Sequence, residues 1–423
     1  MTRRPWMLVA LLSATATASY LCRVNISVTG ALLMNEFSLS QIQMGRIFSA
    51  FLLGYALMQI PGGVLADRWG APRVLAGSAL WWVVGTVLLS AAGWGPFRGS
   101  AAGVLTALLV LRFVIGVGEA PTFPAAALGV SRWIPTENQG RANGIVIAAI
   151  GLGSALAPPV LTAIMVRWGW RLALLVSALP AMVVAVAWRR LRNSELPNLP
   201  LSLHKSTDQP LASLRSASFI LLTLSYTLQG YVGYIFVFWF YLYLVQVRHF
   251  DLLRSAALSS LPWILSILSI PIGGMISDRL VAGPLGLRWG RRAIPLFGLT
   301  FAGVFLTLGA RTGNPYLAAV SLAFATALVL SVEGPFWATM MEIAGRRSGA
   351  AGGVMNMGSN IGGLISPALT PILANRMGWE NALYVAAALS VVGALLWFGI
   401  SPTAARVVRS KVLPLSTVPG GRP

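Results

Sequence analysis

The sequence carries very little charge for its length. Only 10% of its 423 residues are Asp, Glu, Lys or Arg, whereas 56% are hydrophobic, and the mean hydropathy is +0.75. Soluble globular proteins carry about 25% charged residues. This composition excludes a soluble two-layer fold and indicates a protein that crosses a membrane many times.

Acidic residues, cysteine and histidine are scarce as well. There are 11 Asp and Glu against 31 Lys and Arg, and the net charge is +20. The single cysteine, Cys22, excludes an internal disulfide, and the 2 histidines are not part of any metal-ligand cluster. The sequence has no P-loop and no nucleophile elbow, so we expect neither an enzyme nor a bound cofactor, and transport without ATP.

Twelve apolar stretches are long enough to span a bilayer, which takes about 20 residues of helix. They lie at 7–34, 43–66, 72–93, 101–131, 139–166, 169–191, 216–246, 254–278, 291–310, 315–341, 347–375 and 379–400. The polar segment 192–215 is predicted to be a cytoplasmic linker between an N-terminal half (1–191) and a C-terminal half (216–401). The Pro-rich, basic tail 402–423 is predicted to be disordered and cytoplasmic.

Basic residues predict the orientation of the chain in the membrane. With both termini cytoplasmic, 21 of the 31 Lys and Arg fall in inner loops and tails, and 8 fall in outer loops. Lys and Arg are enriched on the cytoplasmic side of membrane proteins. The basic character therefore reflects membrane topology, with the lipid bilayer as partner, and does not indicate nucleic-acid binding.

The two halves of the chain repeat one another. Four positions of the first half recur 209 residues later: Gly144, Pro158, Gly169 and Trp170 match Gly353, Pro367, Gly378 and Trp379. GGVLADR at 62–68 also recurs as GGMISDR at 273–279, and GEAP at 118–121 recurs as VEGP at 332–335. Parallel six-helix repeats around a central site are a transporter architecture. The predicted fold is an all-α polytopic membrane protein, with twelve transmembrane helices in two six-helix pseudo-repeats around a central cavity.

Charged residues deep in apolar segments are the candidates for function: Arg23, Arg112, Glu119 and Glu333. Each charge at membrane depth costs about 2.5–3.5 kcal/mol, so it is usually retained for function. Arg112 and Glu119 are two helical turns apart, about 10.5 Å along one face. Both can therefore point into one cavity; the alternative is a buried ion-pair lock between helices. Arginine suits a carboxylate ligand because its guanidinium is a planar fork of donors.

Two carboxylates are candidates for proton coupling. A carboxylic acid in a poorly solvated cavity resists ionisation, so Glu119 can load and release a proton as the cavity changes sides. Glu333 is either a second titrating site or a partner for Arg23. Alternatively, it is a helix-end carboxylate that bonds backbone groups freed by Pro335.

Other polar residues are candidates for substrate contact. Asn356 and Asn360 can bind hydroxyl groups of a sugar, or can form hydrogen bonds between helices instead. Gln229 and Tyr234 can share one face of a cavity, or can serve in packing.

The segment GVLADRWGAPR, from Gly63 to Arg73, resembles the signature loop between helices 2 and 3 of the major facilitator superfamily. Gly63 is expected to permit a close approach of two helices. The resemblance implies an inner gate that closes by charge pairing and governs conformational exchange. Its expected residues in the two halves are Asp67, Arg68, Arg73, Asp278 and Arg279.

Three further motifs narrow the resemblance: YLCRVNIS at 20–27, RFVIGVGEAPTFP at 112–124 and NIGGLISP at 360–367. Together they are similar to the anion:cation symporter branch, which includes bacterial sugar-acid and aromatic-acid permeases, sialin and vesicular glutamate carriers. The resemblance implies that Arg23 and Arg112 hold a substrate carboxylate, that Glu119 takes up a proton, and that Tyr20 contacts the substrate. The position of Cys22 is commonly aspartate in the bacterial permeases, which leaves the proton stoichiometry, and coupling itself, open.

The expected function is secondary active transport of an organic anion, such as a sugar acid, by proton-coupled alternating access. The expected protein is a monomer in the bacterial inner membrane. One alternative is an uncoupled anion exchanger or exporter of the same fold. A more distant alternative is a membrane receptor that binds an organic anion without transporting it.

Overall fold

The computed structural model of the chain describes residues 3–94, 101–191, 215–344 and 348–402. Within these ranges it contains fifteen helices and no strand. Nearly all of the predicted linker and of the tail expected to be disordered lies outside the described residues.

The N-terminal half contains the first eight helices. They are α1 (Arg3–Glu36), α2 (Gln41–Trp69), α3 (Ala71–Ser90), α4 (Ala101–Glu119), α5 (Thr122–Trp133), α6 (Thr136–Trp168), α7 (Trp170–Ser177) and α8 (Leu179–Arg190). The C-terminal half contains α9 (Ala217–Phe238), α10 (Phe240–Gln246), α11 (Leu252–Ala282), α12 (Gly286–Arg311), α13 (Pro315–Ser331), α14 (Glu333–Ala344) and α15 (Ser348–Leu396).

Among the described residues, eleven continuous segments are long and apolar enough to cross a membrane. The last of them, Ala351–Leu396, is 46 residues long and passes through Gly378, whose φ of 87° is not helical. This segment therefore contains two spans joined at Gly378. The prediction of twelve transmembrane helices is confirmed.

The repeat is visible in the backbone as well. Gly169 ends α6 with a φ of 86°, and Gly378, 209 residues later in the sequence, has a φ of 87°. A residue with a Cβ atom is strained at such a φ, whereas glycine is not. Both halves therefore make the same tight turn between consecutive spans, which confirms that they are structural repeats.

Two predicted membrane-spanning segments are each divided into two helices. The segment 101–131 is divided into α4 and α5 at Ala120–Pro121, and the segment 315–341 is divided into α13 and α14 at Val332. Proline lacks a backbone N–H and favours the first turn of a helix, so Pro121 and Pro335 each start a new helix. Each break brings a carboxylate, Glu119 or Glu333, to a helix end.

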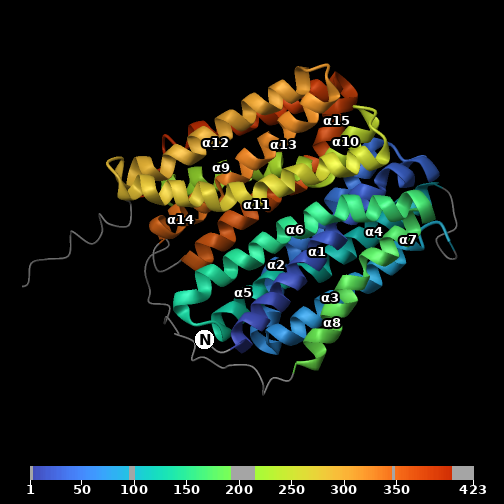
Figure 1. Cartoon of the computed structure of the whole chain (residues 1–423), viewed down its shortest axis with the longest axis horizontal. Coiled ribbons are helices and arrows are strands. Elements are labelled where there is room, and N and C mark those ends of the chain that lie inside the picture. Colours follow the sequence, from blue (N-terminus) through green and yellow to red (C-terminus); the bar gives the residue numbers. More distant parts are fainter. Residues whose placement is uncertain (1–2, 95–100, 192–214, 345–347, 403–423) are drawn as a thin grey trace, which may run out of the picture.

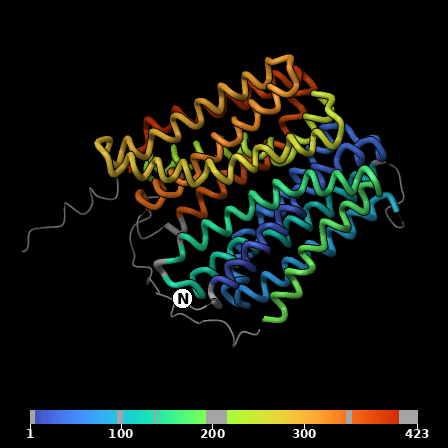
Figure 2. Tube along the Cα trace, in the orientation of Figure 1, coloured from blue at the N-terminus to red at the C-terminus, as the bar shows by residue number. Residues whose placement is uncertain are grey.

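The two halves form separate bundles that lie side by side, coloured blue to green and yellow to red in Figure 1. The main helix pairs that join them are α11 on α6, α15 on α2, α10 on α1 and α9 on α1. In Figure 2 the bundles are closest at the end remote from the N-terminus and diverge towards the end where the N-terminus lies.

Direct contacts connect the bundles at that remote end. Gln41, the first residue of α2, donates from its side-chain amide to the Gln246 side chain at 2.8 Å. The Ser27 hydroxyl donates to the backbone carbonyl of Phe238 at 2.6 Å, and the rings of Phe48 and Phe238 stack 4.9 Å apart. Polar and aromatic groups together therefore close the interface at this end.

Candidate functional site

A buried ion pair between α1 and α4 lies at the centre of the N-terminal half. Arg23 and Glu119 are 1% and 0% exposed, and their closest atoms are 2.6 Å apart. Sequence spacing had suggested that Glu119 acts together with Arg112 on the same helix. The structure instead pairs Glu119 with Arg23, because α4 ends at Glu119 and the carboxylate reaches across to α1.

The two carboxylate oxygens of Glu119 have very different surroundings. Oε1 accepts hydrogen bonds from Arg23 Nε at 2.9 Å, from Arg23 Nη2 at 2.6 Å and from the Ser19 hydroxyl at 2.8 Å. Oε2 is buried and has no hydrogen-bond partner among the described residues. An acid with one saturated and one free oxygen can take up a proton at the free oxygen while the other keeps its contacts.

Arg112 is the second buried arginine, and it is fully unexposed. Its Nε, Nη1 and Nη2 atoms have no hydrogen-bond partner among the described residues. The guanidinium lies over the ring of Phe51, with Cζ 4.5 Å from the ring centroid. A buried charge without hydrogen bonds is costly, so Arg112 is the strongest indication of a group that binds from outside the chain.

Close packing of α2 on α4 holds Phe51 beside Arg112. A Cβ atom on Gly116 would lie 2.0 Å from the Phe51 carbonyl oxygen, and one on Gly54 would lie 2.2 Å from the Phe113 carbonyl oxygen. Only glycine allows two helix backbones to approach this closely. Gly116, in the motif around Arg112, and Gly54 of α2 therefore hold in place the Phe51 ring on which the arginine stacks.

Aromatic rings also surround Arg23. Its Cζ lies 4.6 Å from the ring centroid of Tyr20, 4.6 Å from that of Tyr55 and 5.1 Å from that of Phe51. Arg23 Nη1 also donates to the Tyr20 hydroxyl at 3.2 Å. Tyr20 was singled out from the sequence, whereas Tyr55 and Phe51 were not, because nothing in their local pattern separates a cavity-lining aromatic from a packed one.

The C-terminal half places its own polar cluster at the helix break. Glu333 accepts hydrogen bonds from the Tyr226 hydroxyl at 2.8 Å and from the Gln229 side-chain amide at 2.9 Å. These two donors are side chains of α9, and Trp337 of α14 forms a further side-chain hydrogen bond with Glu333. The hypothesis that Glu333 pairs with Arg23 was wrong in this conformation, since Arg23 is occupied by Glu119. Tyr226 is a further polar residue of this cluster.

Tyr234 and Asn360 connect α9 with α15 near the same level. The Tyr234 hydroxyl donates to the Asn360 side-chain oxygen at 3.3 Å. The Tyr234 ring stacks on that of Phe238, with centroids 6.0 Å apart, and Phe238 stacks in turn on Phe48 of α2. Tyr234 therefore faces the region shared by the two halves.

Asn356 lies one helical turn before Asn360, whose side-chain amide donates to the Asn356 carbonyl at 3.0 Å. The side-chain amide of Asn356 donates to Gln59 of α2 at 3.3 Å, which is a contact between the two halves. The alternative of hydrogen bonding between helices therefore describes Asn356 in this structure.

The expected gate residues are exposed at helix ends. Asp278 pairs with Arg291 at 2.5 Å, and Arg291 also pairs with Glu342 at 2.9 Å. Asp67 and Arg68 make no ion pair among the described residues. The same holds for Arg73 and Arg279, so Arg291, from α12, is a charge partner that the local motif did not indicate.

The close helix approach lies one residue before Gly63. A Cβ atom on Gly62 would lie 2.8 Å from Cα of Pro121, whereas one on Gly63 would only meet Cβ of Pro124 at 3.8 Å, an ordinary contact. In the second half, a Cβ atom on Gly273 would lie 2.0 Å from the Ser331 carbonyl oxygen. The expectation for Gly63 was therefore wrong in register: Gly62 and Gly273 hold the broken helices against their neighbours.

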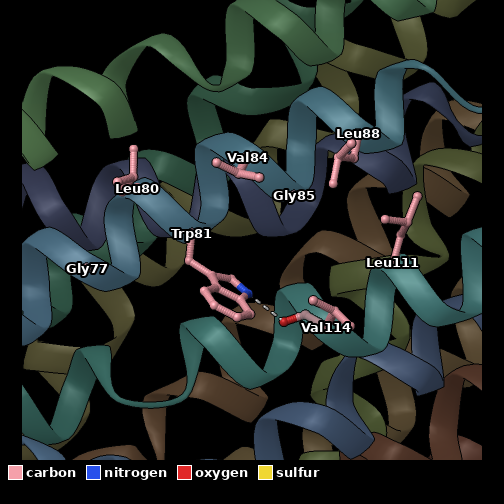
Figure 3. Close-up of a pocket in the computed structure, with 8 residues that line it drawn as sticks. All are labelled: Gly77, Leu80, Trp81, Val84, Gly85, Leu88, Leu111 and Val114. Atoms are coloured by element: carbon pink, nitrogen blue, oxygen red, sulfur yellow. Dashed lines mark hydrogen bonds between the residues drawn. The ribbon is translucent and has the colours of Figure 1, made fainter.

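A separate pocket of about 330 Å³ lies between α3 and α4 (Figure 3). Its lining is apolar, and Trp81, which is 46% exposed, donates from its indole nitrogen to the Val114 carbonyl at 2.8 Å. Without a charged lining residue, this pocket does not suit an ionic ligand. Across the described parts of the chain, no group of three or more His, Cys, Asp and Glu side chains is placed to hold a metal ion.

Comparison with known proteins identifies the family. A family model described as Major Facilitator Superfamily matches residues 11–282 and 279–419. The chain belongs to this superfamily. It is accordingly a membrane transporter and not an enzyme.

Individual relatives of this superfamily member cover nearly the whole chain. It is 32% identical to a probable sulfoacetate transporter, SauU, of Cupriavidus necator, over 94% of both chains. It is 26% identical to a probable galactarate/D-glucarate transporter, GarP, of Escherichia coli, over 93% of both. The crystal structure of a bacterial homologue of the human lysosomal transporter Spinster, inward-facing and occupied, shares the fold with a TM-score of 0.78 at 19% identity, over 98% of this chain and 100% of that one.

Proposed function

We propose that this superfamily member is a secondary active transporter of a small organic anion, coupled to protons by symport. The observation that carries the proposal is the fully buried guanidinium of Arg112, which has no hydrogen-bond partner among the described residues. A carboxylate or sulfonate supplies both the negative charge and the acceptor oxygens that this guanidinium lacks. The named cargoes of SauU and GarP, sulfoacetate and galactarate or D-glucarate, are organic anions, which supports the proposal.

Proton coupling follows from competition for Arg23. While Glu119 is ionised, its Oε1 occupies the Arg23 guanidinium through two hydrogen bonds. A proton on the free Oε2 neutralises Glu119 and weakens its hold on Arg23. Arg23 can then join Arg112 in holding the anion, with Tyr20 beside it. Of the two carboxylates considered for coupling, Glu119 is the one with a free buried oxygen.

The geometry also supports alternating access. In this proposal residues 1–191 and 216–401 rock as two bodies about the shared region, and segment 192–215 connects them in the cytoplasm. The contacts of Gln41 with Gln246 and of Ser27 with Phe238 join the bundles at one end, which in this proposal is the outer, closed end. The exposed gate residues then belong to the cytoplasmic end, where their charges can pair when that end closes.

The positive-inside pattern supports a protein in the bacterial inner membrane with both termini cytoplasmic. The site is built within one chain, since its arginines and carboxylates all come from α1, α4 and α14 of a single copy. A monomer is therefore sufficient for the proposed transport.

An uncoupled exchanger of the same fold is the second candidate, and Cys22 favours it. This side chain is buried and donates to the Ser177 carbonyl at 3.3 Å, so it contributes neither a charge nor a proton acceptor next to Arg23. Reversal potentials of purified protein in liposomes, measured at several pH gradients, separate the two. A reversal potential that does not change with the pH gradient would contradict symport and support uncoupled exchange.

Counterflow in liposomes tests the proposal itself. Liposomes that contain the reconstituted protein are loaded in turn with sugar acids, aromatic acids, dicarboxylates and sulfonates. Liposomes loaded with neutral sugars serve as controls. We expect exchange of at least one anion class and none of the neutral sugars. Exchange of neutral or cationic solutes by a folded sample that moves no anion would refute anion transport.

A further inference from the structure

The apolar pocket between α3 and α4 lies on the membrane-facing side of the N-terminal half. Both helices belong to membrane-spanning segments, Ala71–Ser90 and Ala102–Trp133. The helices that mainly pack on α3 are α8, α4, α5 and α7, and in Figure 1 α3 lies on the side of its bundle away from the C-terminal half. Exposed side chains on that side contact lipid tails. Several residues that line the pocket are exposed in this way, so the pocket is continuous with the lipid-contacting surface: Leu80, Trp81, Val84, Leu88 and Val114.

Trp81 is an unusual residue for the middle of a membrane span. Tryptophan is enriched at the two membrane–water interfaces, where its polar N–H can reach water or lipid headgroups. Trp81 instead lies halfway along the 20-residue helix α3. Its N–H needs a partner at this depth, and it donates to the Val114 carbonyl of α4 at 2.8 Å, drawn as the dashed line in Figure 3. The hydrogen bond therefore holds the ring across the pocket, between the two helices.

The ring of Trp81 also packs on the last turn of α4. A Cβ atom on Gly118 would lie 1.9 Å from Cδ1 of Trp81, so the ring occupies the space that this glycine leaves free. Gly118 directly precedes Glu119, the proposed proton-binding residue. A molecule in the pocket therefore contacts, through a single ring, the turn that carries Glu119.

The length and the lining of the pocket fit a single hydrocarbon chain. On α3 the lining runs from Gly77 to Leu88, about 16 Å along the helix. The hydrocarbon region of one leaflet is about 15 Å thick, half of the bilayer core. None of the residues that line the pocket is charged. Gly77 leaves a notch in the wall, because a Cβ atom there would meet no atom of the described residues within 4 Å.

A transmembrane helix of a second copy fits this surface less well than a lipid tail does. Close helix contacts in membranes use small residues four positions apart. Four positions after Gly77 stands Trp81, and four positions later Gly85 is covered from within, since a Cβ atom there would lie 2.5 Å from Cγ1 of Ile115. We propose that the pocket is a binding site for one acyl chain of a bilayer phospholipid, which packs on Trp81 and holds its ring against the last turn of α4. Binding at this site does not depend on the proposed anion transport.

Fluorescence quenching tests the site on purified protein in detergent micelles. The probe is a phosphatidylcholine with one dibrominated acyl chain, added at increasing mole fraction. In each background, the emission of Trp81 is the difference between the protein with Trp81 and its Trp81→Phe variant. We expect quenching of Trp81 in the wild type to saturate. Gly77→Leu fills the notch and displaces several methylene groups of the chain, so half-maximal quenching should need about tenfold more lipid, or more.

Gly144→Leu is the matched control. Gly144 is an exposed glycine of α6, and a Cβ atom there would likewise meet no atom of the described residues within 4 Å, so this variant should leave the half-maximum unchanged. If Gly77→Leu does not fold, Val84→Phe fills the same pocket from another exposed position of its wall.

Two results would overturn the inference. Quenching of Trp81 that rises in proportion to the lipid without saturation, or that is equal in the wild type and in the filled variant, shows only the contact that any membrane-facing residue makes with lipid. A wild-type dimer that the filled variant dissociates, as measured by light scattering on the same samples, shows instead that a second copy of the chain covers the pocket.

Discussion

Arg23 donates two hydrogen bonds to a single oxygen of Glu119, from Nε at 2.9 Å and from Nη2 at 2.6 Å. The pair joins α1 to α4 in the middle of the N-terminal half, where both side chains are buried. Arg23 therefore contacts only Oε1 of Glu119, and Oε2 is left without a hydrogen-bond partner among the described residues. In the proposed mechanism, the proton binds at Oε2.

Glu119→Gln should abolish proton-driven accumulation and preserve exchange. The amide oxygen can still accept from Arg23, but the side chain no longer ionises, so the site is held in its proton-loaded charge state. We expect counterflow rates within about threefold of wild type, because the binding contacts of the anion remain. Uphill uptake under an imposed pH gradient, measured in the same liposomes, provides the contrast. Normal uphill uptake by the variant would remove Glu119 from the coupling mechanism.

Replacement by methionine should change the stability of the protein in opposite directions at Arg112 and Arg23. Arg112→Met removes a buried charge that makes no hydrogen bond in the chain, so we expect stability to rise by about 1 kcal/mol or more. Arg23→Met leaves Glu119 unpaired and should cost about 3 kcal/mol or more. Thermal unfolding of the ligand-free detergent-solubilised variants checks the sign of each change.

Arg112→Met should also weaken binding of the transported anion. A charge-assisted hydrogen bond contributes about 1.5–3 kcal/mol, which corresponds to about tenfold to a hundredfold in affinity. Binding of the transported anion by calorimetry gives this loss directly. Retained affinity in a variant of raised stability would show that Arg112 does not hold the cargo.

Replacing Arg291 should lower the free energy of unfolding more than replacing Arg279 does. Arg291 pairs with both Asp278 and Glu342, and its side chain is 12% exposed, whereas Arg279 is exposed and makes no ion pair among the described residues. We expect Arg291→Gln to lower the free energy of unfolding by about 1–2 kcal/mol, given that Asp278 is solvated. Arg279→Gln should change it by about 0.5 kcal/mol or less. Equal effects would count against the Asp278–Arg291 pair.

Gly62→Ala and Gly63→Ala form a matched pair with opposite expected signs. A methyl group at Gly62 meets Pro121 at 2.8 Å, so overpacking should cost about 1–3 kcal/mol. At Gly63 the nearest atom is 3.8 Å away, and alanine should gain about 0.5–1 kcal/mol from its higher helix propensity. Melting temperatures of the two purified variants distinguish them. A tolerated Gly62→Ala would place the helix contact elsewhere.

Cysteines at Gln41 and Gln246 should trap the described conformation. The two amides are hydrogen-bonded at 2.8 Å across the bundles, so a short thiol-reactive cross-linker can bridge them in a Cys22→Ser background. We expect transport to stop on cross-linking and to return after reductive cleavage of the linker. Each single-cysteine variant should remain active under the same treatment. Full transport by the cross-linked protein would show that this end does not open.

The helices and the repeat could be predicted from the sequence because the membrane demands long apolar runs and because glycines such as Gly169 and Gly378 are dictated by backbone geometry. Charges at membrane depth likewise made Arg23, Arg112, Glu119 and Glu333 stand out. Each of these features depends only on residues that are close together in the sequence, so the sequence was sufficient to predict it.

Ion pairs between residues on different helices could not be predicted from the sequence. The partner of Glu119 is 96 residues away, and that of Asp278 lies beyond an insertion, on another helix. The spacing of Arg112 and Glu119 along one helix predicted only that both can point into one cavity, and the motif around Asp278 did not indicate Arg291. The register of the glycine contact shifted from Gly63 to Gly62 for a similar reason, since two adjacent glycines look alike until the neighbouring helix is placed.

Phe51 lies against both arginines, with its ring centroid 4.5 Å from Cζ of Arg112 and 5.1 Å from Cζ of Arg23. The two cations are therefore not independent receptors, because each feels any displacement of the ring they share. Thermodynamic linkage makes such a relation mutual: whatever factor a proton on Glu119 adds to anion affinity, the anion adds to proton affinity. In the proposed symport, a mutation that changes the affinity for the anion therefore also changes the pH at which Glu119 is protonated.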